Sequence, residues 1–493
     1  MSFRRDARIV TRELARYYRD SRSRRKPVID QRPLGGIVRE LGLAELASRG
    51  GLTGARLGGF IRRYLERTTR LHHPAYMAHQ VAVPHPSGSL GSLVDGFTNN
   101  AMAIYEMGPA AAAIEFFVIN WLLGKVGWAP APYPEYGAAA PEYGATAPGA
   151  KAPHSAPPGA AGAASAGPAG GVLTHGGSLA NLTALIAARS RLQPDVWEKG
   201  NGADLALLAP AASHYSVARA AGILGLGHRA VYELETDERG VIRPDRLPAA
   251  WDRMTGDGRR AIALVANACS TALGLYDPLE EIAEFCEAHG VWLHVDGAHG
   301  AGALLSGGLR HLLRGVQRAD SLVWDLHKLA RTPTVCAAVL VREAGALDSA
   351  FRQEASYLFH EKQQPGFDFI HRTVECTKAA LGLRFFAVLA AMGERGLASY
   401  VEGLFRAARQ AWEHIAAQPD FECAAEPQAN ILCFRLKAGD ERQMELRARI
   451  LAEGSFYLST AEHAGKRWLR LVFMNPDTGP REVERLLARL RAA

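Results

Sequence analysis

The segment Ser321-Leu-Val-Trp-Asp325-Leu-His327-Lys328 joins a short apolar run to a lysine. Such a run is typical of a buried strand, so Lys328 is expected at one end of a sheet. Lysine is rarely buried without a reason, and a desolvated lysine has a lowered pKa and is a good Schiff-base nucleophile. The alternative interpretation is a solvated lysine on a turn.

One strand-helix-strand step upstream lies Val291-Trp-Leu-His-Val-Asp296-Gly-Ala298-His299. This apolar run ends in Asp296, followed by small residues. A carboxylate at the end of a strand can face the ring nitrogen of a pyridine cofactor and keep that nitrogen protonated, which makes the ring an electron sink. A helix N-cap is the alternative role for Asp296.

Two further segments follow apolar runs nearer the N-terminus. In Thr174-His-Gly-Gly-Ser-Leu-Ala-Asn181 the glycines permit a tight turn, and Ser178 opens a helix. Free backbone N–H groups and the helix dipole suit a phosphate there, although Gly-Gly-Ser is also a common N-cap turn. In Ser213-His214-Tyr215-Ser216 the imidazole can stack on a planar ring, or it is a surface histidine near a helix start.

Strand and helix patterns alternate through the middle of the chain. Helical patterns cover Leu179–Arg189 and Leu279–Ala288. Apolar runs occur at Gly171–Leu173, Leu205–Leu208, Ala261–Val265, Val291–Val295, Ser321–Trp324 and Cys336–Val341. This alternation predicts an α/β fold with a mostly parallel sheet covered by helices. Ligands bind such sheets outside the carboxyl ends of the strands, where all four segments above fall.

Composition divides the chain further. Residues 129–170 are almost entirely Ala, Pro and Gly, which predicts a flexible insertion that lacks the large apolar groups needed for ordering. We expect an N-terminal helical segment over 1–92 and a large domain over 93–378. A small C-terminal α+β domain over 379–493 is expected from short strands at Ile431–Leu436 and Trp468–Phe473 and a final helix from Pro480.

The whole chain has the composition of a globular enzyme. Of its 493 residues 48% are hydrophobic and 22% charged, and the six cysteines form no CxxC pair. We therefore expect no disulfide framework and no metal site. No run of eighteen apolar residues and no secretory signal is found, which predicts a cytoplasmic protein without membrane contact.

The net charge of +7 is concentrated before residue 27, where arginine is dense. A nucleic-acid arm is one interpretation. We favour an amphipathic helix around Glu13–Tyr18 that packs on a partner subunit, because no aromatic–basic pattern or nucleic-acid motif accompanies the arginines. No nucleic-acid partner is expected.

Together, these motifs resemble the group II pyridoxal 5′-phosphate (PLP)-dependent amino-acid decarboxylases, which include the aromatic amino-acid, glutamate and diaminobutyrate enzymes. The resemblance runs from about residue 70 to the C-terminus, without the insertion. It is carried by Tyr105-Glu-Met-Gly-Pro109, Gly176-Gly-Ser-Leu-Ala-Asn181, His214-Tyr-Ser-Val, Leu275-Tyr-Asp-Pro-Leu279, Trp292-Leu-His-Val-Asp296-Gly-Ala298-His299 and His327-Lys328.

The resemblance implies PLP fold type I, with a seven-stranded sheet, and a homodimer with shared active sites. It implies that Lys328 forms a Schiff base with PLP, that Asp296 pairs with the ring nitrogen and that His214 stacks on the ring. Catalytic roles are implied for Lys328, His214, Asp296 and His327. The remaining cofactor contacts implied are Gly177, Ser178, Ser270, Thr271, Ala298, His299 and Asp325. The region Tyr76–Gly108 would line the substrate pocket, with His79, Gln80, His85 and Asn99 as a polar wall.

Three residue choices depart from the family pattern. Asp325 replaces the usual asparagine three residues before the lysine, and a carboxylate repels a phosphate unless it is protonated or turned away. The usual Gly-Thr-Thr reads Cys269-Ser270-Thr271. The loop His360–Phe369 contains no tyrosine, whereas the family uses a loop tyrosine to protonate the carbanion. His299, His360 or Tyr357 are the alternative acids.

The predicted function is decarboxylation of an L-amino acid to an amine and CO₂. The alternatives are oxidative deamination to an aldehyde, retro-aldol cleavage, transamination and, from another class, a non-catalytic PLP-binding scaffold. The sequence does not reveal which amino acid is the substrate.

Overall fold

The computed structural model describes residues 3–134, 167–351 and 366–492. These residues form two compact units, one built from Met1–Val83 with Gly403–Ala493 and the other from Pro84–Glu402. The first unit therefore combines both ends of the chain. The domain boundaries expected at 92 and 378 stay a prediction.

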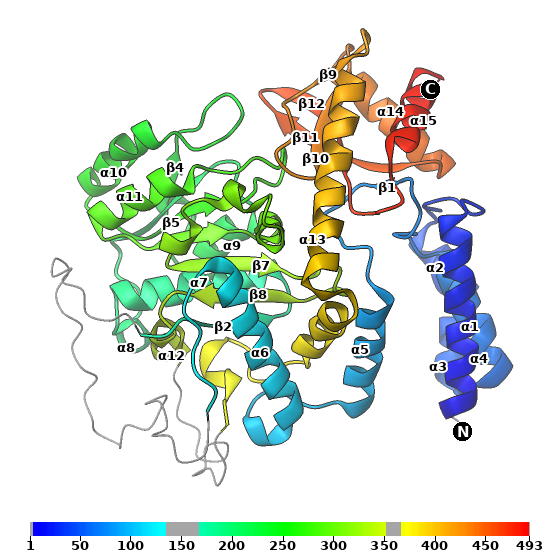
Figure 1. Cartoon of the computed structure of the whole chain (residues 1–493), viewed down its shortest axis with the longest axis horizontal. Coiled ribbons are helices and arrows are strands. Elements are labelled where there is room, and N and C mark those ends of the chain that lie inside the picture. Colours follow the sequence, from blue (N-terminus) through cyan, green and yellow to red (C-terminus); the bar gives the residue numbers. More distant parts are fainter. Residues whose placement is uncertain (1–2, 135–166, 352–365, 493) are drawn as a thin grey trace. The chain divides into compact units, whose positions relative to one another are not determined.

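The larger unit contains a seven-stranded sheet in the order β2-β8-β7-β6-β5-β3-β4 (Figure 1). Its strands are β2 (Gly170–Thr174), β3 (Leu205–Pro210), β4 (Val231–Leu234), β5 (Arg260–Asn267), β6 (Leu293–Asp296), β7 (Ser321–Asp325) and β8 (Ala337–Val341). The pairs from β7 through β4 are parallel, whereas β8 runs antiparallel to both β7 and β2. The prediction of a mostly parallel seven-stranded α/β sheet is confirmed.

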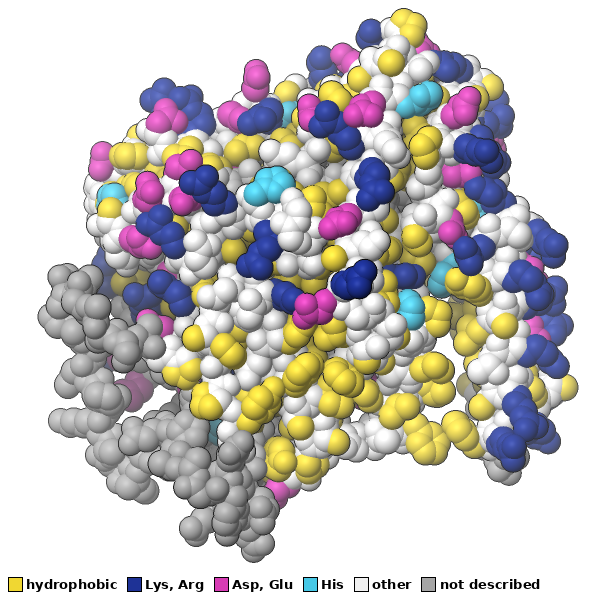
Figure 2. Space-filling view, in the orientation of Figure 1, with side chains coloured by type: hydrophobic (Ala, Val, Ile, Leu, Met, Phe, Trp, Pro, Cys, Tyr) yellow, Lys and Arg dark blue, Asp and Glu magenta, His cyan; other side chains and the backbone are white. Residues whose placement is uncertain are grey.

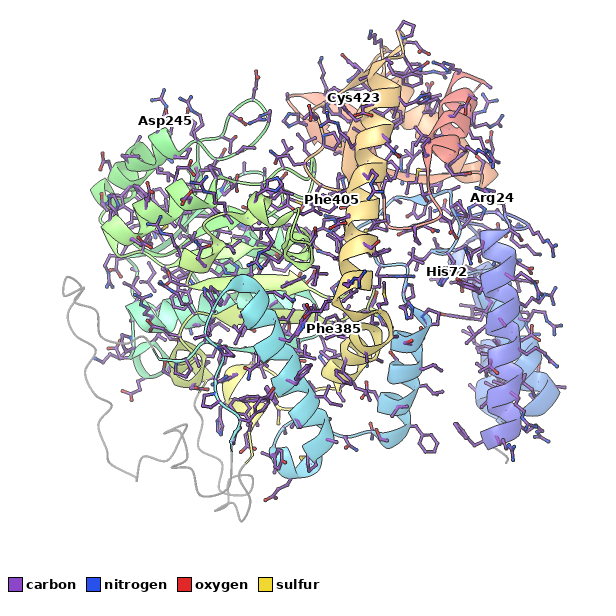
Figure 3. All side chains as sticks on the ribbon, viewed as in Figure 1. Arg24, His72, Asp245, Phe385, Phe405 and Cys423 are labelled. Atoms are coloured by element: carbon purple, nitrogen blue, oxygen red, sulfur yellow. The ribbon has the colours of Figure 1, made fainter. Side chains whose placement is uncertain are left out.

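Helices pack against these strands (Figure 1): α7 lies against β8, β7 and β5, with α9 and α12 against α7, whereas α10 lies against β4 and β5 and α11 against β5. The helices of this unit that precede α13 are α5 (Pro86–Thr98), α6 (Pro109–Val126), α7 (Gly177–Leu192), α8 (Val196–Lys199), α9 (Ser216–Ile223), α10 (Leu247–Gly256), α11 (Leu279–His289) and α12 (Gly345–Phe351). Helix α7 is buried along much of its length because the sheet and α9 and α12 pack around it, so it lacks a polar stripe. The following helix α13 (Leu381–Ala416) has a non-helical residue at Gly393 and packs Phe385 against Trp121 of α6, with ring centres 5.7 Å apart (Figure 3).

The other unit has a five-stranded sheet in the order β1-β11-β12-β10-β9. Its strands are β1 (Tyr76–Met77), β9 (Phe421–Cys423), β10 (Ile431–Leu436), β11 (Tyr457–His463) and β12 (Lys466–Val472). Its helices are α1 (Phe3–Arg22), α2 (Leu34–Leu41), α3 (Leu43–Arg49), α4 (Gly54–Glu66), α14 (Asp440–Glu453) and α15 (Pro480–Ala492). The expected strands at 431–436 and 468–473 and the final helix from Pro480 are confirmed.

One helix among the described residues, α6, is long and apolar enough to cross a membrane when judged by length and composition alone. Half of it is buried, with Val118, Leu122 and Leu123 in the interior of the larger unit. A buried core helix passes the same test, so α6 alone is weak evidence for a membrane span.

Most of the predicted insertion, residues 135–166, lies outside the described residues. The two stretches that flank it lie side by side. Pro130 and Ala169 form a parallel β-bridge, and the Ala169 N–H donates to the Ala129 carbonyl at 3.0 Å. Ala131 is buried at 7% exposure, so these flanking residues belong to the packed structure.

Candidate active site

Lys328 lies in the turn directly after β7, where its amine forms an ion pair with Asp325. Lys328 Nζ is 2.9 Å from Asp325 Oδ2, and the two side chains are 19% and 3% exposed. Burial lowers the pKa of Lys328, but the Asp325 carboxylate, helped by Asp296, raises it by more, so the net shift is upward. The lowered lysine pKa that the sequence predicted is therefore wrong, because the sequence argument considered burial without its partner.

Asp325 also faces the glycine turn that was predicted to hold a phosphate. A Cβ placed on Gly177 would come within 2.8 Å of both Asp325 carboxylate oxygens, so only glycine fits there. Gly176 precedes it with φ at +103°, a backbone angle that favours glycine, and α7 begins at the next residue. Asp325 Oδ1 is buried without a hydrogen-bond partner among the described residues. This oxygen can accept a proton shared with a phosphate.

Asp296 ends β6, the strand beside β7, and is 6% exposed. Its Oδ1 accepts from the Ala298 N–H at 3.1 Å, and its Oδ2 accepts from Asn181 Nδ2 at 2.9 Å. The nearest helical turn, a 3-10 turn, starts only at Gly300, so Asp296 caps no helix. Asn181 was quoted in the glycine motif without a role, and only the folded chain shows that it reaches this carboxylate.

His214 lies at the end of the loop between β3 and α9 and is half-buried. Its Nδ1 is 2.7 Å from Ser216 Oγ, and its ring centre lies 4.1 Å from that of the exposed Tyr215. Burial lowers the pKa of His214 most, while the charges of Asp296 and Lys328 act on it in opposite directions. The Ser216 hydroxyl that contacts His214 also accepts from Asn181 Nδ2, which donates to Asp296 as well, so the imidazole lies at the same end of the sheet.

Of the other predicted cofactor contacts, Ser178 lies in the first turn of α7, and the rest lie on the turns after β5 and β6. Ser270 accepts from the Leu275 N–H at 3.2 Å and helps close the turn that contains Thr271. Ala298 accepts from the Asp325 N–H at 2.9 Å, and His299, 3% exposed, is next to it. This backbone hydrogen bond ties the turn after β6 to the end of β7.

His327 is 8% exposed and is held by the backbone of Cys336. Its Nδ1 is 2.9 Å from the Cys336 carbonyl oxygen, and its Nε2 is 3.7 Å from Asp325 Oδ2. This placement makes His327 a neighbour of the Asp325–Lys328 pair.

The predicted substrate contacts are divided between the two units, and their role in one pocket stays a prediction. His79 and Gln80 belong to the unit that contains the chain termini, where His79 Nε2 lies 2.9 Å from the Tyr457 hydroxyl. Asn99 is exposed at the C-cap of α5 with φ at 51°, a backbone role that suits asparagine. Most of the loop His360–Phe369, including Gln363 and Gln364, lies outside the described residues, as does Tyr357.

The comparisons with known proteins identify the family. A family model described as "Pyridoxal-dependent decarboxylase conserved domain" matches residues 156–437, more than half of the chain. The chain belongs to the pyridoxal-dependent decarboxylase family. The resemblance expected from the motifs is therefore confirmed, and the family cofactor is pyridoxal 5′-phosphate.

Relatives in this family are similar over long stretches. The acidic amino acid decarboxylase GADL1 of Mus musculus is 32% identical over 338 residues, which are 64% of this chain and 62% of that protein, so the match spans less than two thirds of the relative. Cysteine sulfinic acid decarboxylase of Rattus norvegicus is 28% identical over 450 residues, 87% of this chain and 84% of the relative. The crystal structure of mouse CSAD superposes with a TM-score of 0.84 at 25% identity, covering 99% of this chain and 98% of the other.

The site residues of this member of the family fit the cofactor. Lys328 offers an amine, Asp296 offers a buried carboxylate fixed by two donors, and Gly177 leaves room where a side chain would clash. A phosphate bound at the glycine turn would face the Asp325 carboxyl group, and one proton held between the two groups would remove their repulsion.

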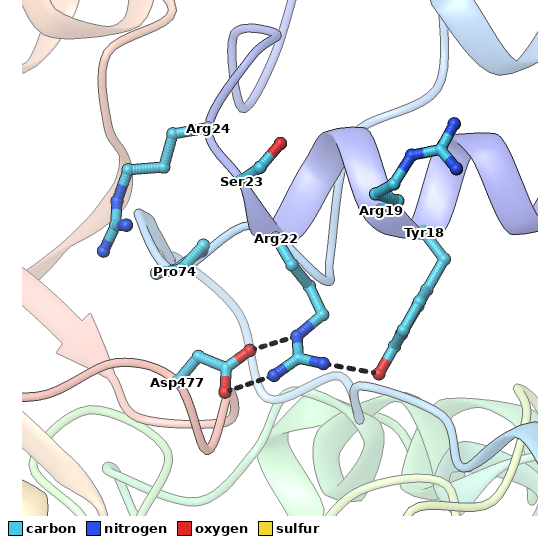
Figure 4. A pocket seen from close by; sticks show the side chains of 7 residues that line it. All are labelled: Tyr18, Arg19, Arg22, Ser23, Arg24, Pro74 and Asp477. Carbon is cyan, nitrogen blue, oxygen red and sulfur yellow. Dashed lines mark hydrogen bonds and ion pairs between the residues drawn. The ribbon is translucent and has the colours of Figure 1, made fainter.

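The arginine-rich start of the chain lines a hollow of about 520 Å³ in the terminal unit (Figure 4). Arg22 donates to both carboxylate oxygens of Asp477 at 2.6 and 3.0 Å, and Arg24 pairs with Glu482. Helix α1 itself is tied to α4, because Arg62 donates to Glu13 at 3.0 Å. Since acidic partners already neutralise these arginines, the hollow is a poor site for an anion.

Proposed function

We propose that this chain decarboxylates an L-amino acid to an amine and CO₂. The observation that carries the proposal is the placement of Lys328, Asp296 and the Gly177 turn at one end of one sheet. When bound, PLP withdraws electrons from the substrate Cα, which makes loss of CO₂ possible. Lys328 is the amine that would carry the cofactor, and Asp296 would hold a proton at the ring nitrogen.

The remaining site residues orient these groups. His214 would lie against the ring, and His327 and Asp325 would hold the Lys328 amine in place. Ser178, Ser270 and Thr271 would donate to the phosphate, with Ala298 and His299 beside the ring. Replacing His214, His327, Ser178, Ser270, Thr271 or His299 singly by alanine and measuring the dissociation constant of PLP tests the assignment, since loss of a true contact weakens binding and loss of a bystander does not.

We infer that the substrate carries an acidic side chain. The similarity to proteins named acidic amino acid decarboxylase and cysteine sulfinic acid decarboxylase supports this class. His79, Gln80 and Asn99 are the proposed polar contacts. The test is CO₂ release from aspartate, glutamate and cysteine sulfinate, with alanine, ornithine and tyrosine as matched comparisons. Turnover of a neutral or basic amino acid above all three acids would contradict the inference.

A second candidate reaction is oxidative deamination to an aldehyde. It is favoured by the lack of a tyrosine in the sequence of the loop His360–Phe369. Without a placed phenol, the carbanion loses a general acid worth typically about 10²–10⁴-fold in rate. Single-turnover product analysis with and without oxygen separates the two reactions. Clean amine that does not change with oxygen supports decarboxylation with another acid.

We further propose that the protein is a homodimer located in the cytoplasm. Helix α5 supports the dimer, because one of its faces is apolar and exposed, at Leu90, Leu93, Val94 and Phe97 (Figure 2). Light scattering of the purified protein tests the mass of the assembly. A monomer that retains full activity would contradict shared active sites.

A further inference from the structure

A branched chain of buried hydrogen bonds runs beneath the Asp296 carboxylate and ends at His214. One branch joins Trp292 Nε1 to Ser321 Oγ at 2.8 Å, Ser321 Oγ to His294 Nδ1 at 2.8 Å and His294 Nε2 to Asn181 Oδ1 at 3.0 Å. The other joins Asn181 Nδ2 to Ser216 Oγ at 2.9 Å and Ser216 Oγ to His214 Nδ1 at 2.7 Å. The four linking residues are at most 2% exposed: Asn181, Ser216, His294 and Ser321.

The two ends of the first branch set the direction of every hydrogen bond in it. An indole N–H only donates and an ionised carboxylate only accepts. Asn181 must therefore present its amide nitrogen to Asp296, which leaves its oxygen for His294. His294 accordingly carries its proton on Nε2, and its Nδ1 accepts the Ser321 hydroxyl, whose oxygen receives the Trp292 N–H.

The protonation state of His294 agrees with this direction. Burial lowers the pKa of His294 to about 4, and the Asp296 carboxylate raises it by less. A neutral imidazole is what the chain requires, because a doubly protonated ring would have no acceptor nitrogen for Ser321.

The second branch determines which atom donates in the hydrogen bond between Ser216 and His214. The second N–H of the Asn181 amide donates to Ser216 Oγ, which leaves the Ser216 hydroxyl hydrogen for His214 Nδ1. The backbone N–H of Ser216 also points to that nitrogen, at 3.3 Å. Two donors therefore point at His214 Nδ1. A proton on Nδ1 would leave both of them without an acceptor.

We propose that Asn181 and Ser216 are positioning residues that fix His214 as the neutral tautomer protonated on Nε2. His214 Nε2, the nitrogen left to face the substrate or the cofactor, is then a hydrogen-bond donor. It can donate to a substrate carboxylate or to the ring oxygen of the cofactor. The inference rests on the proposed function, in which His214 lies against the ring. It adds that the same amide fixes both the Asp296 carboxylate and the direction of the His214 proton.

The test is ¹⁵N NMR of histidine-labelled protein without added cofactor, with the His214 signals assigned by His214→Gln. Wild type should show an unprotonated Nδ1 and a protonated Nε2. Ser216→Ala removes one hydrogen bond to Nδ1 and should shift the tautomer ratio about fivefold toward Nδ1–H. Ser216→Thr keeps the hydroxyl and should restore the wild-type ratio. Ser213→Ala is the matched control, since the Ser213 hydroxyl in the same loop is buried without a hydrogen-bond partner among the described residues.

The outcomes separate this inference from the proposed reaction. A protonated Nδ1 in wild type, or an unchanged tautomer in Ser216→Ala, overturns the positioning role even if the enzyme decarboxylates amino acids. If the protein shows the expected tautomers but releases no CO₂, the positioning role of Asn181 and Ser216 stands and the proposed reaction is overturned. The absorbance spectrum of bound PLP is the second measurement, and it should change in Ser216→Ala but not in Ser213→Ala.

Discussion

The carboxylate of Asp325 and the amine of Lys328 form a close ion pair, with Oδ2 and Nζ 2.9 Å apart, in the turn that follows β7. In the proposed function, this pair places an acceptor for a proton beside the amine that would act as the nucleophile. It also places a negative charge against the Gly177 turn. One side chain therefore affects both the reactivity of Lys328 and the binding of an anion.

Replacing Asp325 by asparagine should speed cofactor attachment at neutral pH. Asp325 raises the pKa of Lys328 against the effect of burial, so without it burial dominates and the pKa falls. A larger fraction of the amine is then deprotonated at pH 7. The pH midpoint of PLP attachment, followed by absorbance, should move to lower pH in Asp325→Asn. Asp245→Asn, at an exposed carboxylate of the same unit, should leave it unchanged (Figure 3).

Lys328→Ala should abolish covalent attachment of the cofactor. Borohydride reduction of wild type followed by peptide mass analysis should label Lys328 alone. The alanine variant should lose the yellow colour and the label, whereas Lys199→Ala, at an exposed lysine paired with Asp195, should keep both. Covalent label at another lysine in the alanine variant would show that the central assignment is wrong.

Asp296→Asn should reduce turnover far more than it reduces PLP affinity. The neutral amide cannot hold a proton at the ring nitrogen, so the cofactor withdraws electrons less well. Both partners of the Asp296 carboxylate, Asn181 Nδ2 and the Ala298 N–H, are donors. The NH₂ group of the introduced side chain would face one of them, which should cost about 1–3 kcal/mol in stability. Steady-state kinetics, PLP titration and thermal unfolding measure the three effects. Turnover at the wild-type rate would exclude the role of Asp296.

Stability should fall when the pH is lowered from about 6.5 to about 4. His73 is 4% exposed, and burial first, then Arg24, lowers its pKa to about 4. The folded state then binds fewer protons than the unfolded state in this window, so acid favours unfolding by about 3 kcal/mol at this one site. His73→Asn keeps the acceptor for the Ala75 N–H and removes the titration.

Urea unfolding at pH 7 and pH 4 measures this effect. The asparagine variant should lose about 3 kcal/mol less than wild type between the two pH values. His311→Asn, at an exposed histidine, is the control and should lose as much as wild type. Equal losses in all three proteins would show that His73 does not titrate as its burial requires.

Replacing residues 135–166 by a short Gly-Ser linker should leave the melting temperature and PLP binding nearly unchanged. The composition of this stretch offers little apolar burial, and a shorter loop costs little entropy to close. Removing 130–169 is the contrasting variant, because it deletes the Pro130–Ala169 bridge and the buried Ala131. If the first replacement lowers the melting temperature as much as the second, the interior of the insertion contributes to the fold.

The strands that carry the candidate site could be predicted because they are buried on both faces and read as unbroken apolar runs. Strand β4 (Val231–Leu234) was missed, since it lies at the sheet edge and Glu233 is exposed there. The residue types at Lys328 and Asp296 could be recognised from their motifs. Their electrostatic environment could not, because the pKa of Lys328 depends on how Asp325 folds back toward it.

Contacts between distant segments were likewise invisible in the sequence. Asn181 and Asp296 are far apart in the chain and meet only when α7 packs across the sheet. The expectation that His79 and Asn99 share one pocket wall stays a prediction, because the two residues belong to different units. Which polar residues meet depends on packing, and a local pattern carries no information about it.

The antiparallel strand β8 has a consequence for the order of events during protein synthesis. Among the described strands, β8 lies between β2 and β7, and the edge strand β2 pairs with β8 alone. Strand β2 therefore cannot join the sheet, and the glycine turn after it cannot be positioned, until residues 337–341 have been synthesised. A growing chain should leave the ribosome as far as β8 before its cofactor site can close, so PLP capture reports that the whole large sheet has assembled.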